Sequence, residues 1–190
     1  KALTLSVDDV DNRSGEISSS LLMNVKGLRL DNSGGGKILS GSNIGLSVTK
    51  LINQSKGLIA ASKGAVTVTG ATLDNSGGNL GSLNGLVITL DDALTNSLGA
   101  ISSDGTLTVN AARIDNSNGS LGSAGNLKLT SIGVLLNQAG SINTASALTL
   151  NSGSLDNSRK GAIYGQGLSR IETGAVDNSQ GGKLTSGAAL

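Results

Sequence analysis

Aspartate is the residue type best placed to do chemistry in this chain, because it recurs in a short phrase of the form apolar-Asp-Asn-Ser. The phrase reads LDNS at residues 73–76, and close relatives of it occur along the whole sequence. Carboxylates repeated on one surface could bind a divalent cation, or could act as acid and base on a polysaccharide. The 190 residues include no His and no Cys, so Ser-His-Asp triads, Cys nucleophiles and the usual zinc sites are excluded.

Composition also argues against several classes of partner. The only aromatic residue is Tyr164 and the formal net charge is +1, so the chain has neither stacking platforms nor a basic surface for nucleic acid. No stretch approaches the roughly 18 consecutive apolar residues of a membrane span, so we predict no membrane insertion by this segment. We expect no cofactor and no metal site, because the Asp phrase lacks the Gly-Gly-x-Gly-x-Asp and EF-hand calcium motifs.

The Asp phrase is part of a repeat that covers the whole chain. Aligning the phrases gives one amide residue per unit, and neighbouring amides are 19 to 22 residues apart. We predict that these amides point inward at a corner of each unit and form a structural ladder of hydrogen bonds. The predicted ladder consists of Asn12, Asn32, Gln54, Asn75, Asn96, Asn116, Gln138, Asn157 and Asn178.

Strands must position these corners. Between the phrases, apolar and polar residues alternate in runs such as LTL at 3–5 and VTV at 66–68, which is the period of a β-strand. Each unit offers three short strands, and such a unit can bury its apolar side only by stacking on its neighbours. The sequence therefore predicts an all-β fold, a parallel β-helix (solenoid) of about nine coils, as a single array over residues 1–190.

Two inward columns of aliphatic residues are predicted to form a narrow core. The first column contains Leu30, Ile52, Leu73, Leu94, Ile114, Leu136, Leu155 and Val176. The second contains Ile17, Ile38, Ile59, Leu80, Ile101, Leu121, Ile142, Ile163 and Leu184.

The residues beside the first column are predicted to point outward. Neutral residues interrupt the carboxylates there, so that no more than two Asp occupy adjacent coils. The predicted outward column is Asp11, Asp31, Asn53, Asp74, Thr95, Asp115, Asn137, Asp156 and Asp177. The glycines after the phrase are not followed by a helix signal, which argues against a phosphate-binding loop. We expect them in tight corners with positive φ: Gly34, Gly35, Gly36, Gly77 and Gly78.

Two alternative folds fit less well. A leucine-rich repeat has a similar period, but its L-x-x-L-x-L-x-x-N spacing does not match any unit, including LNGLVITLDDALTN at residues 83–96. Disorder would suit the abundant Gly, Ser and Asn, but disordered chains do not keep aliphatic residues in register over nine units.

One segment breaks the uniform pattern. In KGAIYGQGLSRIE, residues 160–172, Tyr164 and Arg170 interrupt small and aliphatic residues. Exposed aromatic and arginine side chains are typical of contact sites, so this pair is a candidate for one. The alternative interpretation is that Tyr164 and Arg170 only adjust the local side-chain packing and contact no partner.

The repeated phrase, followed about ten residues later by Leu-Thr-Leu, resembles the haemagglutinin repeats of filamentous haemagglutinin and of contact-dependent growth-inhibition exoproteins. Units written INQS, LNQAG and LTNS depart from the commonest form. The resemblance implies a right-handed β-helical filament, secreted to the bacterial cell surface through an outer-membrane transporter of two-partner secretion. Proteins of this kind act in virulence as adhesins, or they deliver a toxin to a neighbouring cell.

Three functions follow as hypotheses. The first is a structural stalk, part of a much longer filament, because the chain begins within one unit at KALTL and stops within another at KLTSGAAL. The second is an adhesive rod that itself binds a host glycan or a surface protein on the target cell. The third is a polysaccharide-cleaving β-helix enzyme. The dispersed acidic residues and uniform repeats offer no distinct cleft for a substrate, so we expect that the chain is not an enzyme.

Overall fold

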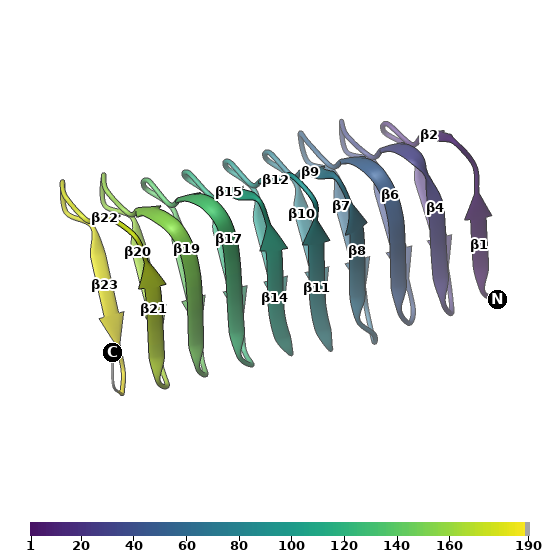
Figure 1. Ribbon diagram of the computed structural model, residues 1–190. Helices are drawn as coiled ribbons and strands as arrows, with labels where there is room; N and C mark the ends of the chain where they lie inside the picture. Colours follow the sequence, from purple (N-terminus) through teal and green to yellow (C-terminus); the bar gives the residue numbers. More distant parts are fainter. Residues whose placement is uncertain (189–190) are drawn as a thin grey trace.

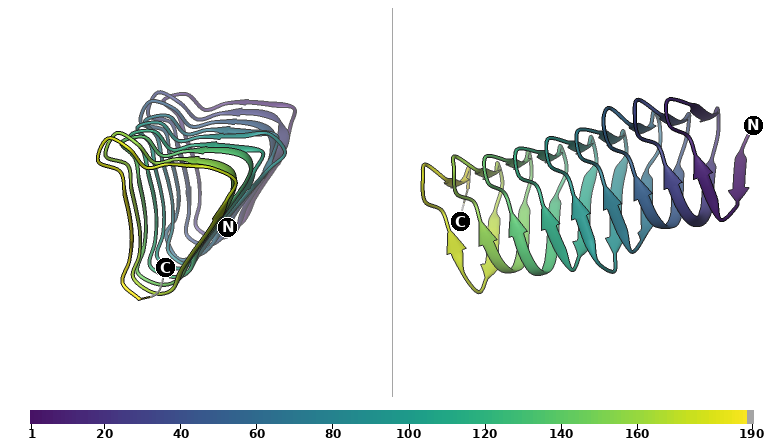
Figure 2. Two further views of the ribbon diagram at one scale, coloured as in Figure 1. Left: turned by 60° about the vertical axis from the view of Figure 1, so that its left-hand side comes forward. Right: turned by 90° about the horizontal axis from the view of Figure 1, so that it is seen from above.

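Every strand pair in the computed structural model, which describes residues 1–188, is parallel and joins one coil to the next. The chain winds as a rod with a triangular cross-section (Figures 1 and 2). The predicted parallel β-solenoid is therefore confirmed, and five of its nine coils have the three short strands expected of each. Two residues of the final KLTSGAAL segment, 189 and 190, lie outside the described part of the chain.

One side of the triangle is a nine-stranded sheet, with one strand per coil. Its strands are β3 (Glu16–Ser19), β5 (Lys37–Ser40), β7 (Leu58–Ala61), β10 (Asn79–Ser82), β13 (Ala100–Ser103), β16 (Ser120–Ser123), β18 (Ser141–Thr144), β20 (Ala162–Gly165) and β23 (Lys183–Ser186).

A fourteen-stranded sheet bends to make the other two sides. In four coils one long strand covers both sides: β4 (Met23–Asp31), β6 (Ile44–Ile52), β17 (Leu127–Leu136) and β19 (Leu148–Asp156). In the other coils the strand is interrupted at the bend, which gives the pairs β1 (Leu3–Ser6) and β2 (Asp9–Asp11), β8 (Val66–Gly70) and β9 (Thr72–Asp74), β11 (Gly85–Leu90) and β12 (Ala93–Thr95), β14 (Thr106–Ala111) and β15 (Arg113–Asp115), and β21 (Ser169–Thr173) and β22 (Val176–Asp177). We call the side that carries the Asp phrases, with β2, β9, β12, β15 and β22, the Asp side.

The core is a set of stacked aliphatic columns inside the triangle. The predicted column from Ile17 to Leu184 runs in unbroken register through the nine-stranded sheet, and Ile38 to Ile163 in it are almost fully buried. Burying each such side chain stabilises the fold by roughly 1.5–3 kcal/mol. Because each coil covers the next, the column is continuous although the rod is thin.

The predicted column on the Asp side is wrong at two coils. Leu51 pairs with Leu73 and is fully buried, whereas Ile52 lies outward beside Asp74. In the same way Leu135 is buried beside Leu155, and Leu136 lies outward. Both units carry two consecutive aliphatic residues before the amide, and a shift of one residue in a strand exchanges its inner and outer faces.

Candidate functional site: the Asp-Asn corner

The corner that follows the Asp side contains a continuous ladder of asparagine side chains. From Asn12 to Asn157, each Nδ2 donates a hydrogen bond to Oδ1 of the asparagine in the next coil, over 2.6–2.8 Å. The observed ladder is Asn12, Asn32, Asn53, Asn75, Asn96, Asn116, Asn137, Asn157 and Asn178.

Backbone carbonyl oxygens satisfy the remaining donors of the ladder. Asn96 is typical: its Nδ2 also lies 3.3 Å from the carbonyl oxygen of Gly99 and 3.0 Å from that of Ser120. The asparagines from Asn32 to Asn157 are fully buried. A buried amide whose hydrogen bonds were unmet would destabilise the fold, so the ladder both needs and maintains the stacking of the coils.

Gln54 and Gln138 do not belong to this ladder, and their prediction as members is corrected. Asn53 and Asn137 take the inward position, and each glutamine lies one residue further along the corner. There Gln54 Nε2 donates to Oδ2 of Asp74, and Gln138 Nε2 donates to Oδ2 of Asp156. The physical reason is fit, because only the amide in register with the Asn of both neighbouring coils can both accept and donate along the column.

The Asp of the phrase binds its own corner. In Asp31 and Asp74, Oδ1 accepts hydrogen bonds from the backbone N–H and the hydroxyl of the serine two residues later, over 3.0 and 2.6 Å respectively. Asp156 makes the same pair of bonds with Ser158. This local arrangement is an Asx-turn, which explains why Asp and Ser recur on either side of Asn.

The electrostatics of two of these carboxylates reflect the same contacts. Burial disfavours the charged form of Asp31, but the two hydrogen bonds from Ser33 and the nearby Arg29 outweigh it and lower the pKa of Asp31. Arg29 lies 2.6 Å from Asp31 and 3.2 Å from Asp9. The pKa of Asp156 is also lowered, because hydrogen bonds from Ser158 and Gln138 outweigh burial. The residues of the corner and its neighbours therefore supply the hydrogen bonds and the positive charge that stabilise the ionised form of these carboxylates.

The outward Asp series is interrupted at alternate coils in the middle of the rod. The register places Ile52, Thr95 and Leu136 between Asp31, Asp74, Asp115 and Asp156, so the predicted interruptions at Asn53 and Asn137 are wrong. Carboxylates two coils apart are about 9.6 Å apart, which weakens their repulsion. Within residues 1–188, no three acidic side chains lie close enough together to hold a metal ion.

Glycine closes each corner for a steric reason. A Cβ on Gly78 would lie 1.8 Å from the backbone oxygen of Asn53, and one on Gly99 would lie 2.1 Å from that of Asn75. Of the five glycines predicted to have positive φ, Gly34, Gly35 and Gly77 do so, whereas Gly36 and Gly78 do not. Residues with side chains also adopt positive φ in these corners: Ser14, Ser55, Lys56, Leu98, Asn118, Ala139, Arg159, Lys160 and Gln180.

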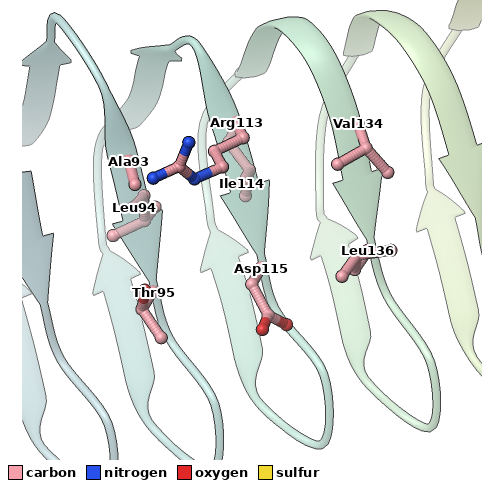
Figure 3. Close-up of a pocket in the computed structure, with 8 residues that line it drawn as sticks. All are labelled: Ala93, Leu94, Thr95, Arg113, Ile114, Asp115, Val134 and Leu136. Atoms are coloured by element: carbon pink, nitrogen blue, oxygen red, sulfur yellow. The ribbon is translucent and has the colours of Figure 1, made fainter.

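A shallow depression lies on the Asp side, across β12, β15 and β17. Small residues at Ala93 and Thr95 leave space beside Arg113, Asp115 and Leu136, as Figure 3 shows. Its volume is about 170 Å³, below the roughly 300–1,000 Å³ of sites for small molecules. The depression could accept a side chain or a sugar substituent, but it does not enclose a ligand.

Tyr164 and Arg170 lie on different sheets. Tyr164 points outward from β20 of the nine-stranded sheet and is 41% exposed. Arg170 is an exposed residue of β21, where it pairs with Glu172, whose hydrogen bond and charge raise the pKa of the arginine. The two side chains therefore face outward from two sides of the triangle and do not form one patch.

Sequence comparison agrees with this geometry. The family model of the haemagglutinin repeat matches residues 1–97, 95–135 and 132–190, which together cover the chain. Comparison with curated proteins and with solved structures found no match. Among residues 1–188 there is no helix with the length and apolar character that a membrane crossing requires.

Proposed function

Because the chain belongs to the haemagglutinin repeat family, we propose that it is a stalk segment within a longer exoprotein, a rigid rod that holds an adhesive or toxic tip away from the exporting cell. Proteins with this repeat are typically secreted or surface exoproteins, and a β-solenoid fits a structural filament segment. The family also indicates a structural rather than an enzymatic role.

The unbroken register of the ladder and core is the observation that carries the proposal. Inward asparagines bond from coil to coil from Asn12 to Asn178 without a gap. A rod held in this way is rigid along its axis, since each coil is fixed by both neighbours. Further coils can be added to either end of such a rod by the same contacts, which supports a longer filament.

Export fits the composition. The chain has no Cys, so no disulfide can form before it crosses a membrane unfolded. Coils that stack only on neighbours can form one after another as the chain emerges. The partner that follows from the family is an outer-membrane transporter of two-partner secretion, which would export the unfolded chain to the cell surface.

The stalk proposal is tested by changing length and surface separately in the longer exoprotein. Removing two whole coils, residues 76–116, joins two equivalent corners and should shorten the rod by about 10 Å without disturbing the register. Replacing exposed threonines of the same coils by serine alters the surface at constant length. The proposal predicts that binding or toxin delivery by the tip withstands the surface changes and declines as successive coil pairs are removed. Loss of tip activity in the serine variants, with normal surface display, would contradict it.

Direct adhesion is a second candidate, which the depression around Arg113 and Asp115 favours. The arginine and the carboxylate flank an apolar floor, an arrangement suited to a polar group on a target-cell glycan or protein. The purified chain, labelled and incubated with intact epithelial and bacterial cells, should then bind saturably. Binding that Arg113→Ala and Asp115→Ala leave unchanged would rule out this depression as the contact.

A further inference from the structure

The nine-stranded sheet presents an outer surface unlike the other two sides. Its outward side chains form two columns, which we call the flat face. One column is Glu16, Lys37, Leu58, Asn79, Ala100, Ser120, Ser141, Ala162 and Lys183. The other is Ser18, Leu39, Ala60, Gly81, Ser102, Gly122, Asn143, Tyr164 and Thr185.

Among the nine strands that the structure describes on the flat face, only β3, β5 and β23 carry a charged outward residue. From β7 to β20 all its outward residues are uncharged, and most are Ala, Ser or Gly. An acidic residue, Glu16, stands on the first strand, and a basic residue, Lys183, stands in the same column on the last. The face therefore has opposite charges at equal distances from its middle strand, β13.

Two of its three large apolar side chains are placed in the same symmetrical way, and the third, Leu58 on β7, has the small Ser141 at its mirrored position on β18. Tyr164 stands on β20, the second strand from one end, and Leu39 stands in the same column on β5, the second strand from the other. Tyr164 is 41% exposed and is the only aromatic residue of the chain. A face that carries complementary groups at mirrored positions complements a second copy of itself after a half-turn.

We propose that two copies of the chain pair through their flat faces, antiparallel, about a twofold axis that passes through β13. In this arrangement β3 faces β23 of the other copy, so each Glu16 meets a Lys183. The strand β5 faces β20, so each Leu39 packs against a Tyr164. Lys37 then faces the neutral Ala162, and no two like charges lie directly opposite each other within the two columns.

The size of the face is sufficient for such a pair. Nine coils about 4.8 Å apart, with strands of four residues at about 3.3 Å each, give roughly 40 by 13 Å, or about 500 Å² per copy. The two copies would bury about 1,000 Å² in total, the lower bound for a specific interface. Small side chains favour the contact, because they let two sheets approach closely over the whole face. This inference does not depend on the stalk proposal, since a rod of any function could pair in this way.

The first test is the mass of the purified chain in solution by analytical ultracentrifugation, over micromolar to submillimolar concentrations. Wild type should shift from 18.7 kDa to twice that mass as concentration rises. Ser102→Lys places two lysines opposite each other at the axis and should abolish the shift. Thr89→Lys, on an exposed position of the fourteen-stranded sheet, is the matched control and should dimerise like wild type. Circular dichroism verifies that both variants fold.

Charge reversal then tests the antiparallel order. Glu16→Lys alone and Lys183→Glu alone should each weaken the dimer at least tenfold, and the double variant should recover most of the wild-type affinity. Tyr164 supplies an independent signal, because its fluorescence should become less accessible to acrylamide as the dimer forms. A wild-type chain that stays at 18.7 kDa throughout would overturn the proposal, as would a dimer that Ser102→Lys leaves intact. A dimer that the double reversal fails to restore would overturn the antiparallel order.

Discussion

The inner and outer positions of the Asp-Asn corner follow different rules, although they alternate along the same few residues. Inside, every coil has asparagine, and every asparagine makes the same bond to the next coil. Outside, the same coils accept Asp, Ile, Thr or Leu at one position. The comparison teaches that an inward side chain must match two neighbouring coils, whereas an outward one has only to be compatible with solvent and its own turn.

The largest expected effect comes from placing a charge on the inner side. Leu73→Asp buries a carboxylate among stacked aliphatic residues and should lower the free energy of unfolding by about 4–5 kcal/mol, enough to open neighbouring coils. Asp74→Asn, the adjacent outward change, retains an acceptor for Ser76 but loses the one for the half-buried Gln54, and should alter stability by less than about 1 kcal/mol. Chemical denaturation of the two variants measures both values. Equal midpoints would mean that the assignment of inner and outer faces is wrong.

A smaller effect is expected from breaking the ladder without adding a charge. Asn96→Ala removes a donor and an acceptor between Asn75 and Asn116, and should cost about 2–3 kcal/mol because buried partners lose their hydrogen bonds. Thr95→Ala, one residue away on the outer side, is the control and should cost less than about 1 kcal/mol. If the control destabilised the chain as much as the ladder variant in urea, the ladder would have no special role.

One inner position departs from its column, and repairing it should stabilise the chain. Ser169 lies in register with Leu148, is almost fully buried and has no hydrogen-bond partner for its hydroxyl in the described structure. A Cβ on Gly165 would lie 2.4 Å from the Ser169 hydroxyl oxygen, so the Ser169 side chain points into the space that Thr144 or Ser123 fills in neighbouring coils. Ser169→Leu should raise the free energy of unfolding by about 1–2 kcal/mol, measured by urea denaturation. A decrease would show that this site is too small for leucine.

The smallest effect concerns pH and the outward carboxylates. The pKa values of Asp31 and Asp156 are lowered by folding, so both groups contribute stability above the unfolded value of about 3.9, and this contribution is lost as pH falls through the folded values. The melting temperature should therefore be lower at pH 3 than at pH 7. The double variant Asp31→Asn and Asp156→Asn should show a smaller drop. An identical drop would assign the acid sensitivity to other groups.

The sequence predicted most of the fold, because a period repeated nine times marks strands, corners and core columns together. The ladder was misassigned only where Asn and Gln are adjacent, at 53–54 and 137–138, since either amide suits the phrase. A signal did exist for one of these coils. In the ladder, Asn precedes its corner glycine by three or four residues, whereas Gln138 precedes Gly140 by only two.

Other features of the corner leave no mark in a single sequence. Leu98 and Ala139 adopt positive φ because stacking on neighbouring corners fixes the backbone, and neither residue type favours that conformation. The interruption of the Asp series by Ile52 and Leu136 follows only once the register is known. The positions of Tyr164 and Arg170 on different sides depend likewise on where the chain turns between β20 and β21.

Hydrogen exchange at the backbone amides of the ladder asparagines tests most directly whether the inner column holds the rod together. Each of these amides from Asn12 to Asn157 donates to a carbonyl of the next coil, for example over 2.7 Å from Asn96 to Asp115. In the interior coils, from Asn32 to Asn137, we expect exchange as slow as in the core strands, with one shared free energy of opening. Fast exchange at these corners beside protected strands would contradict the account, because the sheets would then hold the rod without the ladder.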